Sequence, residues 1–354
     1  MGQALRGQTD LTFLKRMFGR LSSNFGWWLN RKDRSGRSLF EGGGLGLDNI
    51  GVFDRSAPLP TGGYLEQADG TAWVALFCQN MLEIAFELAA HDPTYEELAA
   101  NYVMEFLLIA HTMNATGRGG MWDEEDGFYY DVLRLPNGNA MRLKARSIVG
   151  LLPLCATTTV EKWQREQVPK LTAGLQEQLR RMPVLRESIH ATGPGHLGVA
   201  ERGIIGLVNK NRLRRILTRM LDENEFLSPY GIRALSRYHA EHPYVFSADG
   251  QEYRVSYLPA ESDTGMFGGN SNWRGPIWMP VNALIIRGLM HYFAYYGENF
   301  KVECPTGSGK LMNLFEVAYE IANRLTRIFL RDEAGRRPVF GGSEEFQRDP
   351  NWRD

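Results

Sequence analysis

Cysteine is scarce in this chain, and the three that occur, Cys78, Cys155 and Cys304, lie far apart without a Cys-x-x-Cys pair. This scarcity argues against a disulfide framework and a cysteine-based zinc site, and it suits a reducing compartment. The seven histidines contain no His-x-His or His-Glu-x-x-His spacing, so the sequence offers no recognisable metal motif. We therefore expect no bound metal.

An excess of charge of one sign is also lacking, because 40 Lys and Arg residues face 41 Asp and Glu residues. The absence of a basic run argues against a nucleic-acid or anionic-membrane partner. No apolar run reaches about 18 residues, the length that a membrane span needs. The N-terminus also lacks the continuous apolar segment of a signal peptide. We expect a cytoplasmic protein that does not span a membrane; its oligomeric state is left open.

Helical periodicity dominates what is present. The chain has 354 residues, 43% of them hydrophobic, which is enough for a sizeable core. Apolar residues at helical spacing predict helices over residues 11–29, 68–90, 92–114, 147–155, 160–181, 210–221, 281–296 and 314–329. Strand signals are confined to two predicted hairpins, within residues 127–138 and 244–258. No linker divides the chain, so we expect one domain over residues 1–354.

Long polar and aromatic loops separate these helices, and loops of such length are usually functional. The segment "GGGLGLDNIGVFDRSAPLPTGGYLEQADGTAW" carries four acids, Asp48, Asp54, Glu66 and Asp69. A second loop holds Trp122, and a third, "NSNWRGPIW", holds Asn272, Trp273, Arg274 and Trp278. Aromatic faces beside Asp, Asn and Arg suit a sugar, because its C–H faces pack on indole and its hydroxyls need planar polar partners.

A plain structural interpretation competes at each acid. An Asp in a Gly-rich loop most often caps a helix or closes an Asx-turn. We interpret "DEEDG", which contains Asp123 and Asp126, as a solvated turn before a hairpin. The segment "TGSGK" lacks the full spacing of a phosphate loop and is set aside.

Several motifs together resemble glycoside hydrolase family 63, in particular its bacterial glucosidase or mannosyl-oligosaccharide glucosidase-like branch. They are "LDNIGVFDRS", "GGYLEQADGTAW", "GMWDEEDGFYYDVL", "ARSIVGLLPL", "SNWRGPIWMPVN", "ENFKVECPTGSGK" and "RRPVFGGSEEFQRDPNWRD", in order along nearly the whole chain. The family is also similar to mannosylglycerate hydrolases and trehalases. "LDNIGVFDRS" together with "NWRGPIW" is the most specific part of the resemblance.

The resemblance implies an all-α, (α/α)6 barrel fold of the six-hairpin glycosidase type with small hairpins in its loops. It implies hydrolysis of an α-glucosidic or related bond in an oligosaccharide or small glycoside, with inversion and without a metal or organic cofactor. Asp48 maps onto the general acid through "GLDN". Asn49, Asp54, Arg55, Glu66, Asp69, Trp122, Asn272, Trp273, Arg274 and Trp278 become the expected sugar contacts.

Two departures from the family pattern lead us to expect a partial catalytic domain. The family's general base, a Glu, is expected in a stretch that follows the equivalent of "DPNWRD", and a large region is expected before the equivalent of Leu11. About eight helical segments are predicted here, whereas six hairpins need twelve helices. We expect an open barrel edge with exposed apolar surface.

Three alternatives remain open from the sequence. The first is a sugar-binding protein without turnover, which would use the same aromatic loops. The second is a barrel isomerase or epimerase with histidine bases, for which His190, His196, His239 and His242 lie in loop-like stretches. The third is a helical interaction scaffold, which the rich polar and aromatic loops disfavour.

Overall fold

A computed structural model describes residues 10–30, 36–41, 48–115, 117, 119–181 and 197–353. For Asp48 and Arg353 it describes the backbone only. Predictions that concern residues 42–47, His190 and His196 therefore lie outside the described residues.

The described part of the chain is rich in helices, as predicted. They are α2 (Leu11–Leu29), α3 (Ala68–Ala89), α4 (Thr94–Met113), α5 (Lys162–Gln167), α6 (Pro169–Arg181), α8 (Lys210–Met220), α9 (Met279–Tyr296), α10 (Leu314–Arg327), α11 (Glu344–Arg348) and α12 (Pro350–Arg353). Six predicted helices are confirmed within a few residues, namely those at 11–29, 68–90, 92–114, 210–221, 281–296 and 314–329.

One predicted helix is wrong and another is interrupted, and proline contributes to both differences. Residues 147–155 form two short 3-10 turns, η2 (Ile148–Gly150) and η3 (Leu152–Leu154), because Pro153 has no N–H for the hydrogen bond of a continuous α-helix and its ring would clash with the carbonyl four residues earlier. Residues 160–181 form two helices, because Val168 before Pro169 leaves the helical conformation.

The strands form small antiparallel sheets. They are β1 (Tyr64–Glu66) with β4 (Asp131–Arg134) and β5 (Ala140–Leu143), β2 (Trp122–Asp123) with β3 (Phe128–Tyr129), β6 (Thr157–Val160) with β7 (Gly203–Gly206), β8 (Leu227–Ser228) with β9 (Gly231–Ile232), β10 (Tyr244–Ala248) with β11 (Gln251–Val255), and β12 (Lys301–Glu303) with β13 (Leu311–Asn313). The hairpin predicted within residues 244–258 is confirmed as β10–β11, and its turn residues Asp249 and Gly250 both have positive φ. The other predicted hairpin continues past residue 138 into β5.

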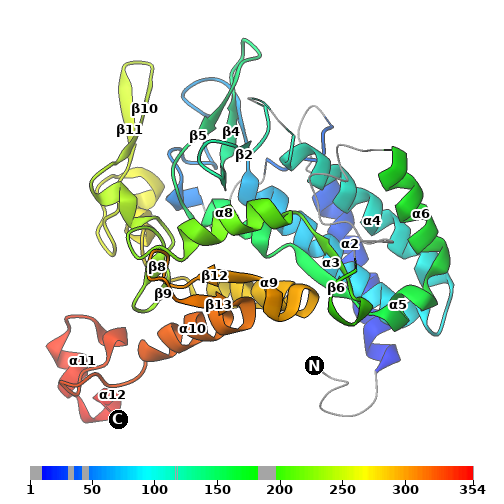
Figure 1. The fold of residues 1–354 in the computed structure, drawn as a ribbon. Helices are drawn as coiled ribbons and strands as arrows, with labels where there is room; N and C mark the ends of the chain where they lie inside the picture. Colours follow the sequence, from blue (N-terminus) through cyan, green and yellow to red (C-terminus); the bar gives the residue numbers. More distant parts are fainter. Residues whose placement is uncertain are drawn as a thin grey trace.

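Helix α3 is at the centre of the core. It packs against α2 on one side and forms an antiparallel hairpin with α4, while α9 and α10 form a second pair (Figure 1). Within the described residues, α3 is the one helix long and apolar enough to cross a membrane by length and composition. Of its most apolar 18-residue window, 67% is buried in the protein, as expected for a core helix.

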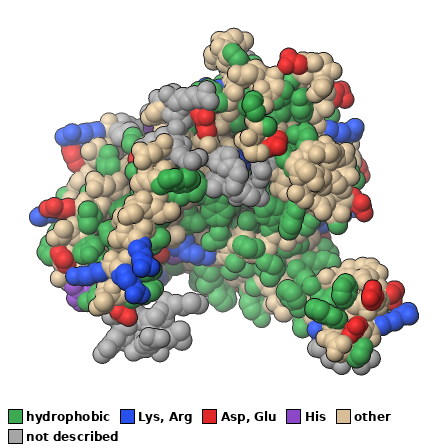
Figure 2. All heavy atoms as spheres, turned by 180° about the vertical axis from the view of Figure 1, so that it is seen from behind, with side chains coloured by type: hydrophobic (Ala, Val, Ile, Leu, Met, Phe, Trp, Pro, Cys, Tyr) green, Lys and Arg blue, Asp and Glu red, His purple; other side chains and the backbone are tan. Residues whose placement is uncertain are grey.

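The C-terminal residues extend away from this core. Helices α11 and α12 project beyond α10 (Figure 1), and the outer side of α10 exposes Phe315 and Tyr319, the latter by 62%. Seen from behind, the molecule shows hydrophobic side chains gathered over the middle of its rear face (Figure 2). The described part of the chain thus exposes apolar side chains on α10, and the open barrel edge stays a prediction.

Candidate functional site

Two short turns that are distant in sequence meet at an open pocket. Turn η1 (Asp48–Ile50) contacts η6 (Met266–Trp273), and Asn49 Nδ2 donates a hydrogen bond to the Asn270 carbonyl at 3.0 Å. The pocket has a volume of about 550 Å³ and is lined by Asn49, Asp54, Ser56, Phe267, Gly268, Asn270, Trp273 and Trp278. This volume is typical of a site for a small ligand.

Two tryptophans supply most of the aromatic surface of the pocket. Trp273 is 50% exposed, and its ring stands nearly perpendicular to that of Trp278, at 83° with 5.6 Å between centroids. Trp278 Nε1 donates to the Trp273 carbonyl at 3.3 Å, which helps to hold the pair in place. Exposed indole faces beside amide groups are what a sugar ring needs for stacking and hydroxyl recognition.

Two buried amide oxygens, one in η1 and one in η6, lack a hydrogen-bond partner among the described residues. They are Asn49 Oδ1 and Asn272 Oδ1. Asn49 lines the pocket, whereas Asn272, an expected sugar contact, is not among the residues that line it. Buried polar atoms are normally paired, so an unpaired one in a pocket is available to a ligand or to water. Asp48 begins η1, immediately before Asn49, but its side chain lies outside the described residues.

Asp54 has a local structural role as well as a place in the pocket wall. Its Oδ1 accepts a hydrogen bond from the Ser56 backbone N–H at 2.9 Å and a second from the Ser56 hydroxyl. This is the Asx-turn that the plain interpretation expects of an Asp in such a loop.

Arg274, which was expected to contact the sugar, is 1% exposed and binds the protein's own backbone instead. Its guanidinium donates to the carbonyls of Asn49 at 3.1 Å, Gly51 at 2.9 Å and Arg254 at 3.0 Å. Burial lowers the pKa of Arg274, although Asp263, 3.6 Å away, opposes this shift. Arg274 therefore fastens η1 and β11 to η6 beneath the pocket.

Arg55 forms a second buried connection between the loop that follows η1 and the core. With its side chain 2% exposed, it pairs with Asp69 at 2.7 Å and Asp131 at 2.6 Å. Asp131 also accepts a hydrogen bond at 2.8 Å from the backbone N–H of Ala68, the first residue of α3. Burial alone lowers the pKa of Arg55, but the two carboxylates outweigh it and raise that pKa. The pKa of Asp131 is raised, mainly by burial. The charge of Arg55 lowers it and the charge of Asp69 raises it further.

Glu66 is likewise a buried ion-pair residue in this structure. It is fully buried and pairs with Arg134 at 3.0 Å and with Arg37. Asp69 is also fully buried. Glu66, Asp69 and Arg55 thus support the loop beside the pocket, and none of them lines the pocket.

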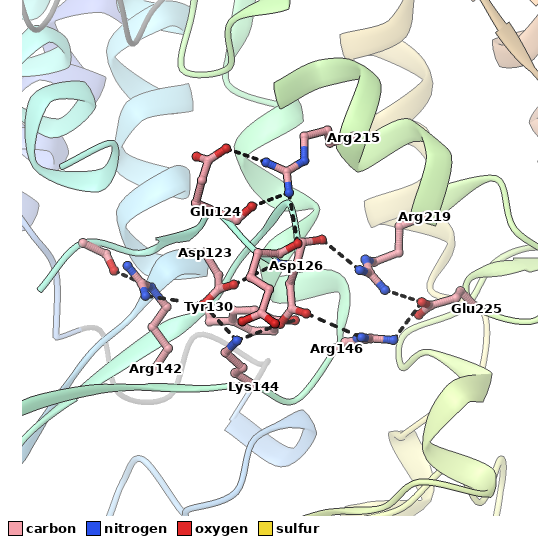
Figure 3. A network of polar contacts seen from close by, with 12 residues as sticks. Asp123, Glu124, Asp126, Tyr130, Arg142, Lys144, Arg146, Arg215, Arg219 and Glu225 are labelled. Atoms are coloured by element: carbon pink, nitrogen blue, oxygen red, sulfur yellow. Dashed lines mark hydrogen bonds and ion pairs between the residues drawn. The ribbon is translucent and has the colours of Figure 1, made fainter. Parts of the chain in front are cut away.

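The "DEEDG" segment differs from the solvated turn that we predicted, because its first and last acids join a polar network (Figure 3). Asp123 is 5% exposed and pairs with Lys144 at 3.0 Å and Arg142 at 3.4 Å. Although burial opposes it, hydrogen bonds from the Asp126 backbone and Lys144 lower the pKa of Asp123.

Asp126 extends the same network toward α8. It pairs with Lys144 at 3.1 Å and Arg146 at 3.7 Å, and Arg146 in turn pairs with Glu225 at 2.9 Å. Arg219 of α8 binds both the Asp126 carbonyl and Glu225 (Figure 3). The predicted turn is therefore clamped between β5, α8 and the loop that carries Glu225.

Trp122 and His239 are also buried away from the pocket. Trp122, an expected sugar contact, is 3% exposed, and its Nε1 donates to Glu124 at 2.7 Å. His239 accepts from the Arg146 backbone N–H at Nε2, and its Nδ1 lies 2.8 Å from the His242 carbonyl, so both ring nitrogens are engaged. Burial lowers the pKa of His239 to about 4. This arrangement removes His239 as a base for an isomerase.

Sequence reasoning missed several residues that shape the site, among them Asp131 and Phe267. Asp131 is the partner that Arg55 shares with α3, and Phe267 lines the pocket. The letters "YYDV" and "GMFGGN" carry no signal that separates these residues from ordinary strand and loop positions. Within the described residues, no group of three or more His, Cys, Asp or Glu side chains is arranged to hold a metal ion.

Comparison with known proteins points to one family. The family described as "Glycosyl hydrolase family 63 C-terminal domain" matches residues 64–306. An uncharacterized protein of Saccharomyces cerevisiae is 48% identical over 98% of this chain and 33% of its own length. A probable mannosyl-oligosaccharide glucosidase of Schizosaccharomyces pombe is 33% identical over 27% of this chain and 9% of its own. The chain therefore spans about a third of the S. cerevisiae relative.

Solved structures add a distant likeness. A GH63 mannosylglycerate hydrolase from Thermus thermophilus, crystallised in complex with glucose, aligns over 90% of this chain and 70% of its own, with 12% identity and a TM-score of 0.38. An uncharacterized conserved protein from the same organism aligns over 90% of this chain and 72% of its own, with 14% identity and a TM-score of 0.32.

Proposed function

The chain belongs to glycosyl hydrolase family 63, and from that premise we propose that it is the part of a glycoside hydrolase that supplies the general acid and a sugar-binding pocket. The observation that carries the proposal is the juxtaposition of Asn49, which directly follows Asp48, with the Trp273 and Trp278 rings in one pocket. That pocket combines the aromatic surface and the planar amides that sugar recognition requires.

We propose Asp48 as the general acid that protonates the leaving glycosidic oxygen. An inverting enzyme needs a second carboxylate, which activates water on the opposite face of the sugar. The family resemblance leads us to expect this Glu outside the present chain. Asn49 Oδ1, which has no partner among the described residues, would accept a hydrogen bond from a sugar hydroxyl, and the two tryptophans would stack on the C–H faces of the sugar. The (α/α)6 barrel proposed for the catalytic domain would place these loops at one end.

The proposed substrate is an α-glucosidic oligosaccharide or small glycoside. A GH63 general acid acts by proton transfer, which typically contributes about 10²–10⁴-fold to the rate. Glycoside hydrolysis by two carboxyl groups proceeds without a metal or organic cofactor, so the proposal includes none.

The test is hydrolysis of an α-glucoside by the full-length protein, followed by proton NMR of the first product formed. Inversion predicts that β-glucose appears first and then mutarotates. Initial release of α-glucose would contradict the inverting mechanism. Binding of the glucoside by calorimetry without any release of reducing sugar would instead favour a sugar-binding protein without turnover.

A further inference from the structure

Phe267 is an aromatic residue of the pocket with an unusual backbone conformation. It lies in η6, lines the pocket together with Trp273 and Trp278, and is half-buried. Its φ is +56°, in the left-handed region. A bulky residue with positive φ is an outlier that persists only where the surrounding structure holds it.

The sequence around Phe267 shows that the turn itself does not need a phenyl ring. Gly268 and Gly269 follow with φ of +63° and +83°, so three successive residues adopt the left-handed conformation. Glycine adopts this conformation without a steric penalty, and a third glycine would form the same turn with less strain. Strained residues of this kind cluster at ligand-binding sites, which points to a use for the ring.

The ring is also held in place from behind. The Arg274 guanidinium lies over it, with 5.7 Å between Arg274 Cζ and the ring centroid. Arg274 is itself fixed by the carbonyls of Asn49, Gly51 and Arg254. A ring that is preorganised by a fixed cation loses little freedom when a ligand binds, which favours affinity.

The charge of the pocket identifies the class of ligand. Among the described residues that line it, Asp54 is the one charged side chain, and no Lys or Arg contributes. The positive charge of Arg274 is buried and faces backbone carbonyls. An anionic group would meet Asp54 without a basic partner, whereas an uncharged sugar would meet amides and aromatic rings.

We propose that Phe267 is a substrate-contact residue that forms a third aromatic wall and binds the apolar face of an uncharged sugar ring. The inference rests on the proposed function and deepens it. It assigns the pocket to a neutral saccharide and gives Phe267 a share in binding alongside Trp273 and Trp278.

The experiment measures the affinity of the full-length protein for maltose by calorimetry, in the wild type and in Phe267→Ala, Phe267→Leu and Phe267→Tyr. We expect Ala and Leu to weaken binding about 10-fold and Tyr to stay within about 3-fold, because one stacked ring is worth about one power of ten. Phe346→Ala, which removes an exposed phenyl ring of α11 outside the pocket, is the matched control and should bind as the wild type.

Different outcomes separate the inference from the proposed function. Wild-type affinity in both Phe267→Leu and Phe267→Ala would overturn the role of Phe267, whatever the hydrolysis assay shows. Maltobionate, which carries a carboxylate in place of the reducing-end ring, should bind at least 10-fold more weakly than maltose; equal binding would overturn the uncharged class. A wild type that binds maltose through Phe267 but hydrolyses no α-glucoside would refute the hydrolase alone. A wild type that neither binds nor hydrolyses would refute both.

Discussion

Replacing Arg274 with methionine would remove the guanidinium beneath the pocket while keeping most of the apolar stem. Three backbone carbonyls, those of Asn49, Gly51 and Arg254, would lose their donor. These carbonyls belong to η1, to the residue after it and to β11. The substitution therefore weakens the contacts that connect η1 and the β10–β11 hairpin to the end of η6. The expected result is a less stable protein with a loosened pocket.

The magnitude follows from the hydrogen bonds and the burial of the charge. Each bond from a charged donor contributes about 1.5–3 kcal/mol, and the three are not additive. Removing a buried charge also removes the desolvation cost of burying it, and this gain offsets several kcal/mol of the lost hydrogen-bond energy. Arg274 is 1% exposed, and its nearest acid, Asp263, is 3.6 Å away with a side chain 27% exposed. We therefore expect a net loss of roughly 2–4 kcal/mol.

Urea unfolding monitored by tryptophan fluorescence measures this loss. At a slope of about 3 kcal/mol per molar urea, the midpoint should fall by about 1 M. Arg348→Met is the matched control, since the Arg348 side chain is 80% exposed and pairs with Glu344 on the surface, where ion pairs contribute little. An Arg274→Met midpoint equal to that of the wild type would refute the reasoning that Arg274 fastens the loops.

Three further predictions concern buried groups and the pocket wall. Arg55→Met leaves Asp69 and Asp131 buried without their cation, so unfolding at pH 7 should become easier by about 3–5 kcal/mol. The deficit should shrink as the pH falls and Asp131, whose pKa is raised by burial, becomes protonated; a deficit that is independent of pH would contradict this. Because the folded-state pKa of His239 is about 4, below the unfolded value, the wild type should lose stability as the pH falls from about 6.5 toward 4, by up to about 3 kcal/mol from this group. His239→Gln should show a smaller loss between pH 7.5 and 5 in urea titrations, and equal losses would reject the assignment. Trp273→Ala should weaken maltose binding about 10-fold through its half-exposed indole, which calorimetry would detect; unchanged affinity would remove Trp273 from the site.

Local rules were enough to predict the long helices. Residues 68–90 and 92–114 carry clear helical periodicity and form α3 and α4, which pack against each other. Prediction failed at residues 147–155, where the apolar spacing suggested a helix but Pro153 and tertiary packing favour two 3-10 turns.

The sequence predicted which residue types gather near the candidate site better than it predicted which of them line the pocket. Asn49 meets Trp273 and Trp278 in one pocket, although more than 200 residues separate it from the two tryptophans. Arg274 and Glu66 are of residue types that we expected to contact the sugar. In the structure, however, their side chains bind other parts of the protein and hold loops in place. Sequence does not distinguish an arginine that faces a ligand from one that faces carbonyls, because burial is a property of the assembled loops.

The account's central claim is that Asp48 supplies the acid for glycoside cleavage beside this pocket. The most direct test is the rate of α-glucoside hydrolysis by the full-length protein and its Asp48→Asn variant. Asp332→Asn is the control, because that residue closes an exposed turn far along the chain. The account predicts a loss of at least about 100-fold for Asp48→Asn and the wild-type rate for the control. Wild-type hydrolysis by Asp48→Asn would contradict it.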